Sequence, residues 1–233
     1  MKIYAIILAG GIGKRMNSHT PKQFLEISGK PIILYSLEEF EKNKNINGII
    51  IVINKDLKEN LENILKKFKI SKLKKIVLGG ETRQESAFNG LQALKDVNPD
   101  YVLIHDSARP FLSQDLINRI IDSLKNSIAV NPVIPIKSTI IKSDNEIIKE
   151  FLGKKDLYEG QSPQGFHYNE ILNAHLIAKK NNIINASDDC ILIHRLSKDI
   201  RIVEGDNNLI KITTPEDIEI AKKIWGKMKN GNN

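Results

Sequence analysis

The sequence has little of several features that define protein classes. One cysteine, Cys190, stands among 233 residues, so an intramolecular disulfide framework is excluded and a reducing compartment is favoured. The longest apolar runs, such as Ile49–Ile53, are far shorter than the roughly 20 residues that a helix needs to cross a bilayer. The apolar stretch behind Met1 runs directly into glycines, Lys14 and Arg15, which is not the pattern of a secretory signal. We therefore expect a cytoplasmic protein that does not enter a membrane.

Motifs of several enzyme classes are also absent. No HxxH, HExxH or paired-cysteine spacing occurs, so a zinc site is not expected. No GxSxG elbow marks a serine nucleophile. Charge is plentiful, because 35 Lys and Arg residues against 28 Asp and Glu residues give a net charge of +7. The basic residues are spread along the chain without interleaved aromatics, which is typical of a solvated surface and argues against nucleic acid as a partner.

Short apolar runs alternate with longer amphipathic segments along most of the chain. The runs predict strands at residues 3–9, 49–53, 75–78, 101–105 and 201–204. The amphipathic segments predict helices at residues 31–42, 56–68, 83–94, 114–125, 169–180 and 215–228. The β-branched run at 49–53 is typical of a strand buried on both faces. This order predicts the α/β class, with a mainly parallel sheet and helices on both faces.

The middle of the chain interrupts this alternation. Residues 130–150 contain Pro132 and Pro135, followed by two alternating pieces at 139–142 and 146–149. Residues 143–145 between these pieces have the composition of a turn. We expect a β-hairpin arm, at about 135–158, inserted in a single domain that spans residues 1–233.

The first predicted strand ends in a glycine-rich loop, LAGGIGKRM. Glycines after a strand let backbone N–H groups approach a phosphate closely. Met16 stands where the dinucleotide fingerprint needs glycine, and no Walker A sequence follows. The cations Lys14, Arg15 and Lys22 lie within nine residues, which suits a triphosphate. The alternative is a plain strand-to-helix turn with solvated charges.

Asp106 follows a second apolar run, at the carboxyl end of a predicted central strand, where open α/β sheets place ligands. A lone carboxylate there suits Mg²⁺, and the alternative is a cap for the next turn. We expect the neighbouring His105 to pack or hydrogen-bond. The segment GGETRQES, at 79–86, is either a nucleotide-contacting turn or an ordinary βα loop with a helix cap. Lys211, after the last predicted strand, is a further candidate cation.

Seven segments in one order are similar to those of a known family. They are LAGGIGKRM, PKQFLEISGKPI, GGETRQES, HDSARPF, GQSPQGF, SDDC and IKITTPEDI. From about Ile3 to Ile224 the chain resembles the cytidylyltransferases that act on polyol phosphates. The resemblance implies a Rossmann-like domain whose β-arm builds a homodimer. It also implies that a substrate phosphate attacks the α-phosphorus of CTP and that pyrophosphate leaves with Mg²⁺.

The resemblance also assigns roles by position. It implies that the triphosphate is held by Leu8, Ala9, Gly10, Gly11, Gly13 and Lys14. It implies nucleotide contacts by Gly80, Glu81, Arg83, Ser86, Asp106 and Ser107, with Asp106 binding the metal. The implied catalytic cations are Arg15, Lys22 and Lys211. The implied contacts to the polyol phosphate are Thr139, Lys154, Ser162 and Lys211.

The chain departs from the family pattern at three positions. Lys154 stands where the family has arginine, Ser162 stands where it has threonine, and Leu209 replaces the first residue of an NIK motif. Lysine keeps the charge but loses the bidentate fork of arginine, so the polyol phosphate is expected to be held differently.

The segments LAGG, HDS, GQSPQGF and SDDC favour the D-ribitol 5-phosphate branch of the family. The alternative branch acts on 2-C-methyl-D-erythritol 4-phosphate. An aldose 1-phosphate nucleotidyltransferase is more distant, because such an enzyme would carry a late metal-binding aspartate where this chain offers Lys211. A protein that only binds nucleotide would be expected to lack Arg15, Lys22 or Asp106, and all three are present.

Overall fold

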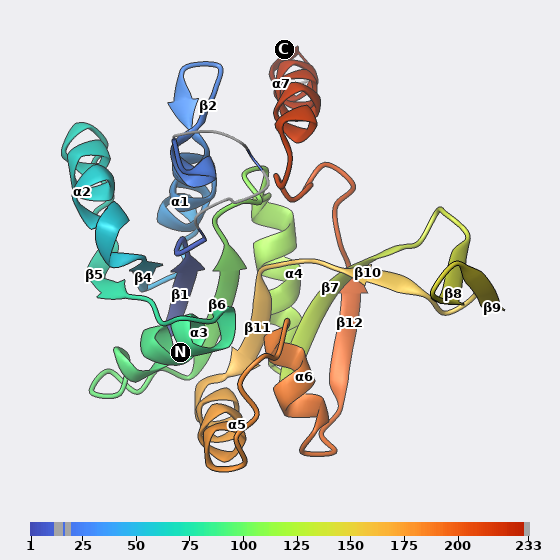
Figure 1. The fold of residues 1–233 in the computed structure, drawn as a ribbon. Coiled ribbons are helices and arrows are strands. Elements are labelled where there is room, and N and C mark those ends of the chain that lie inside the picture. Colours follow the sequence, from blue (N-terminus) through green and yellow to red (C-terminus); the bar gives the residue numbers. More distant parts are fainter. Residues whose placement is uncertain (12–15, 17–19, 231–233) are drawn as a thin grey trace.

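The computed structural model describes residues 1–11, 16 and 20–230. At its centre is an eight-stranded, mainly parallel sheet with helices on both faces (Figure 1). The strands are β1 (Ile3–Leu8), β4 (Gly48–Ile53), β5 (Leu73–Leu78), β6 (Tyr101–Asp106), β7 (Ala129–Pro135), β10 (Tyr158–Gly160), β11 (Gln164–His167) and β12 (Ile200–Glu204). They run in the order β10-β7-β11-β6-β1-β4-β5, and β12 pairs in parallel with β7. The predicted α/β class and the mainly parallel sheet are confirmed.

The parallel half of the sheet is built from β6, β1, β4 and β5. β1 pairs in parallel with both β4 and β6, and β4 pairs with β5. All six residues of β4 are buried, as its β-branched sequence predicts. The side chains of β1 alternate between two cores, with Ile7 packed on one face and Ile6 on the other. All four strands point their carboxyl ends to the same edge of the sheet.

In the described part of the chain, three helices pack on each face of the sheet. Helices α1 (Ile32–Lys42), α2 (Lys58–Lys67) and α4 (Gln114–Leu124) contribute to one core. Helices α3 (Arg83–Gln92), α5 (Tyr168–Lys180) and α6 (Asp189–His194) contribute to the other. The C-terminal helix α7 (Pro215–Asn230) packs in a third cluster with Tyr35 and Phe111. Among the described residues, no helix has the length and apolar character needed to cross a membrane.

The expectation that the alternation of strands and helices is already interrupted at residues 130–135 was wrong. These residues belong to β7, which lies inside the central sheet between β11 and β12. Prolines suggested a break in the sheet, but a proline removes only the N–H of the ladder. The carbonyl of Pro132 still accepts a hydrogen bond from the N–H of Gln161 at 2.8 Å. The sequence also failed to predict β10, β11, α6 and the small hairpin of β2 (Glu26–Ile27) and β3 (Lys30–Pro31).

The predicted hairpin is confirmed as strands β8 (Ile140–Asp144) and β9 (Ile147–Leu152). Asn145 in its turn has φ of 52°, a left-handed conformation that asparagine tolerates well. The hairpin projects beyond the sheet (Figure 1, right). At its base, the N–H of Ile136 donates to the carbonyl of Leu157 at 3.2 Å, and β10 then returns along β7. The large apolar side chains exposed on the hairpin and its base are Ile141, Ile147, Ile148, Phe151 and Tyr158.

Candidate active site

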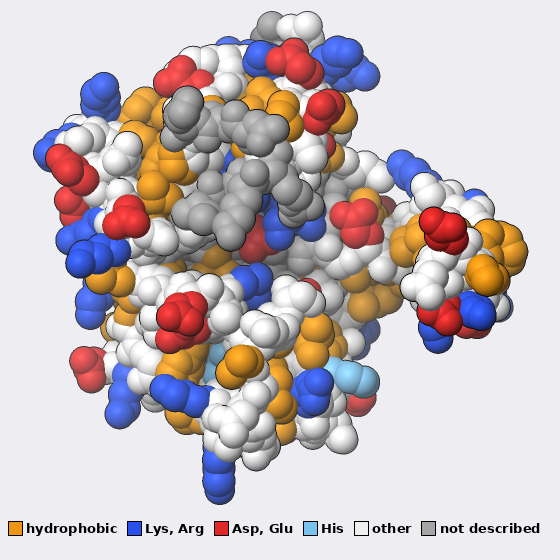
Figure 2. Space-filling model, in the orientation of Figure 1, with side chains coloured by type: hydrophobic (Ala, Val, Ile, Leu, Met, Phe, Trp, Pro, Cys, Tyr) orange, Lys and Arg blue, Asp and Glu red, His pale blue; other side chains and the backbone are white. Residues whose placement is uncertain are grey.

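A cavity of about 500 Å³ opens at the carboxyl ends of the parallel strands. Its walls come from Leu8 at the end of β1, Asn54 after β4, the turn after β5 and Asp106 at the end of β6. This is the edge at which open α/β sheets bind ligands. The space-filling view looks onto the same face and shows basic and acidic side chains gathered at a hollow (Figure 2).

Most of the predicted nucleotide contacts meet in this cavity. Its lining includes Leu8, Gly10, Gly11, Lys22, Gly80, Glu81, Arg83, Ser86, Asp106, Ser107 and Lys211. Ala9 is buried behind them, where its N–H donates to Val52 and its carbonyl accepts from Gln23. The predicted residues Gly13, Lys14 and Arg15 lie outside the described residues.

Within the part of the chain that the structure describes, no side chain or backbone packs so closely on Gly10 and Gly11 that it requires glycine there. A Cβ added to Gly10 would lie 3.7 Å from the nearest protein atom, and one added to Gly11 would lie 3.9 Å away. Both distances are ordinary contacts, so other residues would fit sterically. Both glycines line the cavity, which leaves room for a ligand to approach their backbone closely.

The second glycine turn is shaped by the start of α3. The hydroxyl of Thr82 accepts from the N–H of Glu85 at 3.0 Å, which is the predicted helix cap. The carboxylate of Glu85 folds back to accept from the N–H of Glu81 at 2.8 Å. The hydroxyl of Ser86 accepts from the N–H of Gly80 at 3.1 Å. A Cβ on Gly80 would lie 2.2 Å from the Glu85 side chain, so any larger residue here would displace Glu85 from its bond to Glu81.

The backbone of Asp106 is held by hydrogen bonds at both its N–H and its carbonyl. Its N–H donates to the hydroxyl of Ser162 at 3.1 Å, and its carbonyl accepts from the N–H of Arg109 at 3.0 Å. Ser162, a predicted substrate contact, is therefore buried beneath Asp106 and does not line the cavity. His105 is fully buried, and its nitrogens lie 3.2 Å from Ser162 Oγ and 3.0 Å from the Arg109 carbonyl. The expectation that His105 packs and hydrogen-bonds is confirmed.

The protonation states of these two residues follow from their surroundings. Burial lowers the pKa of His105 to about 4, so its ring is neutral at physiological pH. Burial would raise the pKa of Asp106, but the Arg83 and Lys211 cations outweigh it and hold that pKa below its usual range. Asp106 is therefore an ionised carboxylate at the centre of the cavity.

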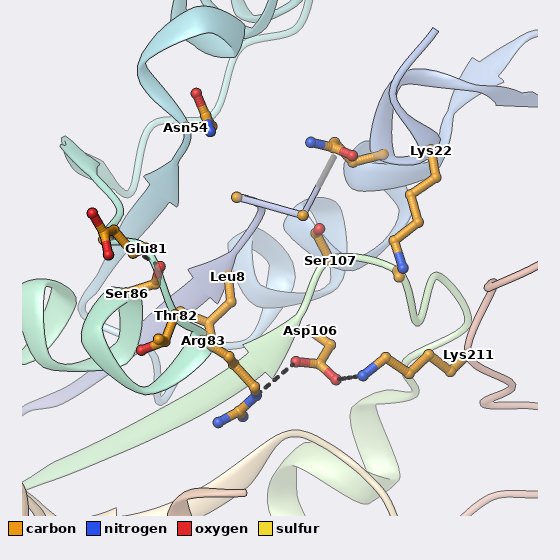
Figure 3. Close-up of a pocket in the computed structure, with 15 residues that line it drawn as sticks. Leu8, Lys22, Asn54, Glu81, Thr82, Arg83, Ser86, Asp106, Ser107 and Lys211 are labelled. Atoms are coloured by element: carbon orange, nitrogen blue, oxygen red, sulfur yellow. Dashed lines mark hydrogen bonds and ion pairs between the residues drawn. The ribbon is translucent and has the colours of Figure 1, made fainter. Parts of the chain in front are cut away.

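Cations from distant segments surround Asp106. The Nζ of Lys211 lies 2.7 Å from Oδ2 of Asp106, and the Nε of Arg83 lies 3.7 Å from Oδ1 (Figure 3). Lys22, from the short 3₁₀ helix at Lys22–Phe24, donates to the carbonyl of Ile212 at 3.2 Å. Lys22 and Lys211 therefore converge on the same side of Asp106 (Figure 3). Three cations against the carboxylates of Asp106 and Glu81 give the described lining a net positive charge, which suits an anionic ligand.

The donor set around Asp106 fits Mg²⁺ better than a transition metal. Within the described ranges, no group of three or more His, Cys, Asp or Glu side chains could hold a metal ion by itself. A single ionised carboxylate in a cavity suited to phosphates is how proteins commonly hold Mg²⁺, which takes its remaining ligands from water and substrate. Asp106 is thus the residue that would bind it.

Two predicted substrate contacts lie away from the cavity. Thr139 is exposed at the start of the hairpin, and Lys154 follows its second strand. The ammonium of Lys154 donates to the carbonyl of Lys137 at 3.0 Å. Neither residue lines the cavity of its own chain.

Sequence reasoning missed four residues of the lining, namely Gln23, Asn54, Thr82 and Ala108. Asn54 had a usable signal, because it directly follows a strand buried on both faces. Its carboxamide oxygen accepts from the N–H of Asp56 and so begins the next 3₁₀ helix, Lys55–Leu57. Gln23 had no such signal, because its bond to the Ala9 carbonyl depends on how the loop folds.

Comparison with known proteins agrees with this geometry. The family model for 2-C-methyl-D-erythritol 4-phosphate cytidylyltransferase matches residues 3–227. The chain belongs to this cytidylyltransferase family. Its site therefore lies in the Rossmann-like fold of a nucleotidyltransferase, as the sequence motifs predicted.

Members of the cytidylyltransferase family with two different names are about equally similar to the chain. The 2-C-methyl-D-erythritol 4-phosphate cytidylyltransferase of Geobacillus kaustophilus is 38% identical over 224 residues, covering 96% of this chain and 97% of that protein. The ribitol-5-phosphate cytidylyltransferase of Vibrio parahaemolyticus is 38% identical over 230 residues, covering 97% of each. The crystal structure of 4-diphosphocytidyl-2C-methyl-D-erythritol synthase from Anaerococcus prevotii aligns with a TM-score of 0.83 and 31% identity, covering 97% of this chain and 96% of that one.

Proposed function

We propose that the protein transfers CMP from CTP to a polyol phosphate, with D-ribitol 5-phosphate as the first candidate acceptor. The observation that carries this proposal is the ionised Asp106 among Lys22, Arg83 and Lys211, beside glycines that leave room for a ligand. A cavity with excess positive charge and one central carboxylate suits a triphosphate that arrives with Mg²⁺.

The residues of the cavity suit phosphoryl-group chemistry. A phosphate oxygen of the acceptor attacks the α-phosphorus of CTP, the bond from that phosphorus to the bridging oxygen breaks, and pyrophosphate leaves with the electron pair. Lys22 and Lys211 line the cavity, and we expect them to stabilise negative charge that develops on the phosphates. Mg²⁺, held by Asp106, supplies further charge neutralisation when bound. No side chain is required as a covalent nucleophile.

Two acceptors are supported by different observations. The segments LAGG, HDS, GQSPQGF and SDDC favour D-ribitol 5-phosphate. The matching family model, and the relative from Geobacillus kaustophilus, carry the name of the 2-C-methyl-D-erythritol 4-phosphate enzyme. This second acceptor is therefore the alternative, and an aldose 1-phosphate is a more distant one.

We also propose that two chains form a homodimer through the hairpin arm. Phe151 is 67% exposed and Ile147 is 65% exposed on a hairpin that projects from the sheet. Apolar side chains gathered on a projecting element mark an interaction surface. A second copy of the chain would cover these side chains. The Thr139 and Lys154 of each chain would then lie toward the cavity of the other chain. On this proposal residues 1–233 form one domain, with the arm as an insertion.

The decisive experiment is an assay of pyrophosphate release from CTP and Mg²⁺. D-ribitol 5-phosphate, 2-C-methyl-D-erythritol 4-phosphate and an aldose 1-phosphate are supplied in parallel, with each matching CDP product identified by mass. The acceptor with the highest kcat/KM is the natural class, and we expect D-ribitol 5-phosphate. If folded protein releases no pyrophosphate with either polyol phosphate, the proposed function is overturned.

A further inference from the structure

One buried carboxylate outside the cavity contacts a residue that lines it. Asp189 is the first residue of α6, and its side chain is 1% exposed. Its Oδ2 accepts a hydrogen bond from Nη1 of Arg83 at 2.8 Å. Its Oδ1 lies 3.1 Å from Nε2 of His175 on α5. Both oxygens thus have partners, as a buried charge requires to be tolerated.

The helix itself does not need this carboxylate. The N-cap of α6 is Asp188, whose Oδ1 accepts from the N–H of Cys190 at 2.7 Å. The other oxygen of Asp188 accepts from Gln164 at 2.6 Å. Capping is therefore complete without Asp189, whose side chain contacts Arg83 and His175 instead. The cost of burying its charge must be offset by those two contacts.

Arg83 stands between two carboxylates. Its contact with Asp189, at 2.8 Å, is a hydrogen-bonded ion pair, whereas its contact with Asp106, at 3.7 Å, lies beyond hydrogen-bond distance. Figure 3 shows the guanidinium beside Asp106, on the side opposite Lys211. The closer bond to Asp189 therefore anchors Arg83, and its contact with Asp106 is an ion pair without a hydrogen bond.

His175 completes this support. Its ring is buried and stacks against Phe88 of α3, with ring centroids 6.0 Å apart. The ring is thus fixed by packing, and it holds the oxygen of Asp189 that Arg83 does not use. A carboxylate held on one side by a packed ring presents its other oxygen in a fixed direction.

We propose that Asp189, supported by His175, is a positioning residue that fixes the guanidinium of Arg83 at the nucleotide cavity. This inference rests on the proposed function, because Arg83 is expected to contact CTP. Asp189 acts by keeping Arg83 in the place where the nucleotide meets it, so that Arg83 does not close its 3.7 Å ion pair with Asp106 into a hydrogen bond. On this proposal Asp189, in the SDDC segment, has a role at the site that the sequence analysis did not assign to any residue of that segment.

The test measures CTP binding without an acceptor, so that no turnover occurs. Asp189→Asn keeps the shape of the side chain and removes the charge that anchors Arg83. We expect its Kd for CTP to rise roughly 10- to 100-fold, by analogy with the loss of a residue that supports a metal ligand. Asp188→Asn is the matched control. It also removes a charge that acts on Arg83, but it keeps a capping side chain and leaves the hydrogen bond between Arg83 and Asp189 intact. We expect its Kd to change less than about threefold.

A double-mutant cycle separates positioning from general loss of structure. If Asp189 acts through Arg83, the variant with both Arg83→Gln and Asp189→Asn binds CTP as Arg83→Gln alone does. The double variant has lost both charges of the ion pair, so it can still be tested if Asp189→Asn alone fails to fold. The thermal midpoint reports whether each variant is folded. A further loss of CTP affinity in the double variant would overturn the proposal.

Failure of this inference and failure of the proposed function give different results. If the wild-type protein binds CTP and Asp189→Asn binds it with the same affinity, only the positioning role of Asp189 is overturned. Folded wild-type protein that binds no CTP overturns the proposed function and the inference with it.

Discussion

The ammonium of Lys211 lies 2.7 Å from the carboxylate of Asp106, although 105 residues separate them in the sequence. The pair joins the end of a central parallel strand to the segment that follows β12. It places a cation beside the candidate metal ligand. The charge of Asp106 therefore governs both the expected metal site and the local arrangement of cations.

Replacing that carboxylate should separate metal binding from nucleotide binding. We expect Asp106→Asn to abolish turnover, because Mg²⁺ loses the only ligand that we assign to it in the protein. Metal-free CTP binding should be kept or strengthened, because a negative charge beside the triphosphate is removed. The pyrophosphate assay checks the loss of turnover, and calorimetry in EDTA checks the metal-free binding of CTP. Full activity of the folded variant, or of wild-type protein in excess EDTA, would contradict the assignment.

Lys22 should act on the rate more than on binding. Its ammonium lies at the cavity near Lys211, where it can meet charge that develops as pyrophosphate leaves. We expect Lys22→Ala to lower kcat by roughly 10²- to 10³-fold, by analogy with the loss of an oxyanion donor, with a much smaller change in CTP affinity. Lys55→Ala is the matched control, because Lys55 is exposed and does not line the cavity. A change confined to CTP affinity would assign Lys22 to ground-state binding.

The arm should complete the site of the other chain. If Lys154 reaches the partner cavity, Lys154→Ala and Lys22→Ala chains are each defective alone and complement each other when mixed. A heterodimer then has one intact site and one doubly defective site, so equal random mixing restores about a quarter of wild-type activity. Lys154→Arg should be tolerated or improved, because its fork suits phosphate.

The mixing experiment needs a control for assembly. Native mass spectrometry of differently tagged chains should show the heterodimer. Heterodimer without recovery of activity would mean that Lys154 does not serve the partner's site.

His105 should make stability depend on pH. Its folded pKa of about 4 lies below the ordinary value of 6.5, so between these values the unfolded chain binds a proton that the folded chain does not. Stability should therefore fall as pH drops through this window, by up to about 1.4 kcal/mol per pH unit from this residue. The lowered pKa of Asp106 acts in the same direction, but only below pH 3.8, its ordinary pKa value.

Urea unfolding at about pH 7.5 and about pH 5 checks this dependence. His105→Gln should be less stable than wild type at the higher pH, because buried contacts with Phe40 and Ser162 are altered. It should lose less stability on acidification, because glutamine does not titrate. Equal losses in both proteins would contradict the neutral, buried histidine.

Local pattern was sufficient for the parallel half of the fold and for much of the cavity. Strands such as β4 are buried on both faces, so their apolar runs are visible without knowledge of the partners. Parallel strands carry their carboxyl ends to one edge, and motifs that follow different strands therefore meet there.

Other features depend on contacts that no local pattern encodes. The prolines in β7 suggested a break in the sheet. Their carbonyls nevertheless pair inside the sheet, which sequence alone does not report. Ser162 was expected at the substrate, but its hydroxyl serves the backbone of Asp106, 56 residues away. Asp189 meets Arg83 across 106 residues, so its contact became visible only in the folded chain.

The arm leaves the sheet at the end of β7 and returns along the same strand, where Tyr158 pairs with Pro135 and Gly160 with Val133. Its two ends are therefore closed by backbone pairing before the hairpin begins. Residues in the hairpin can be gained, lost or exchanged without shifting the register of the central sheet. If the arm joins two chains as we propose, changes in it would alter how the chains associate without moving the strands that carry the nucleotide cavity.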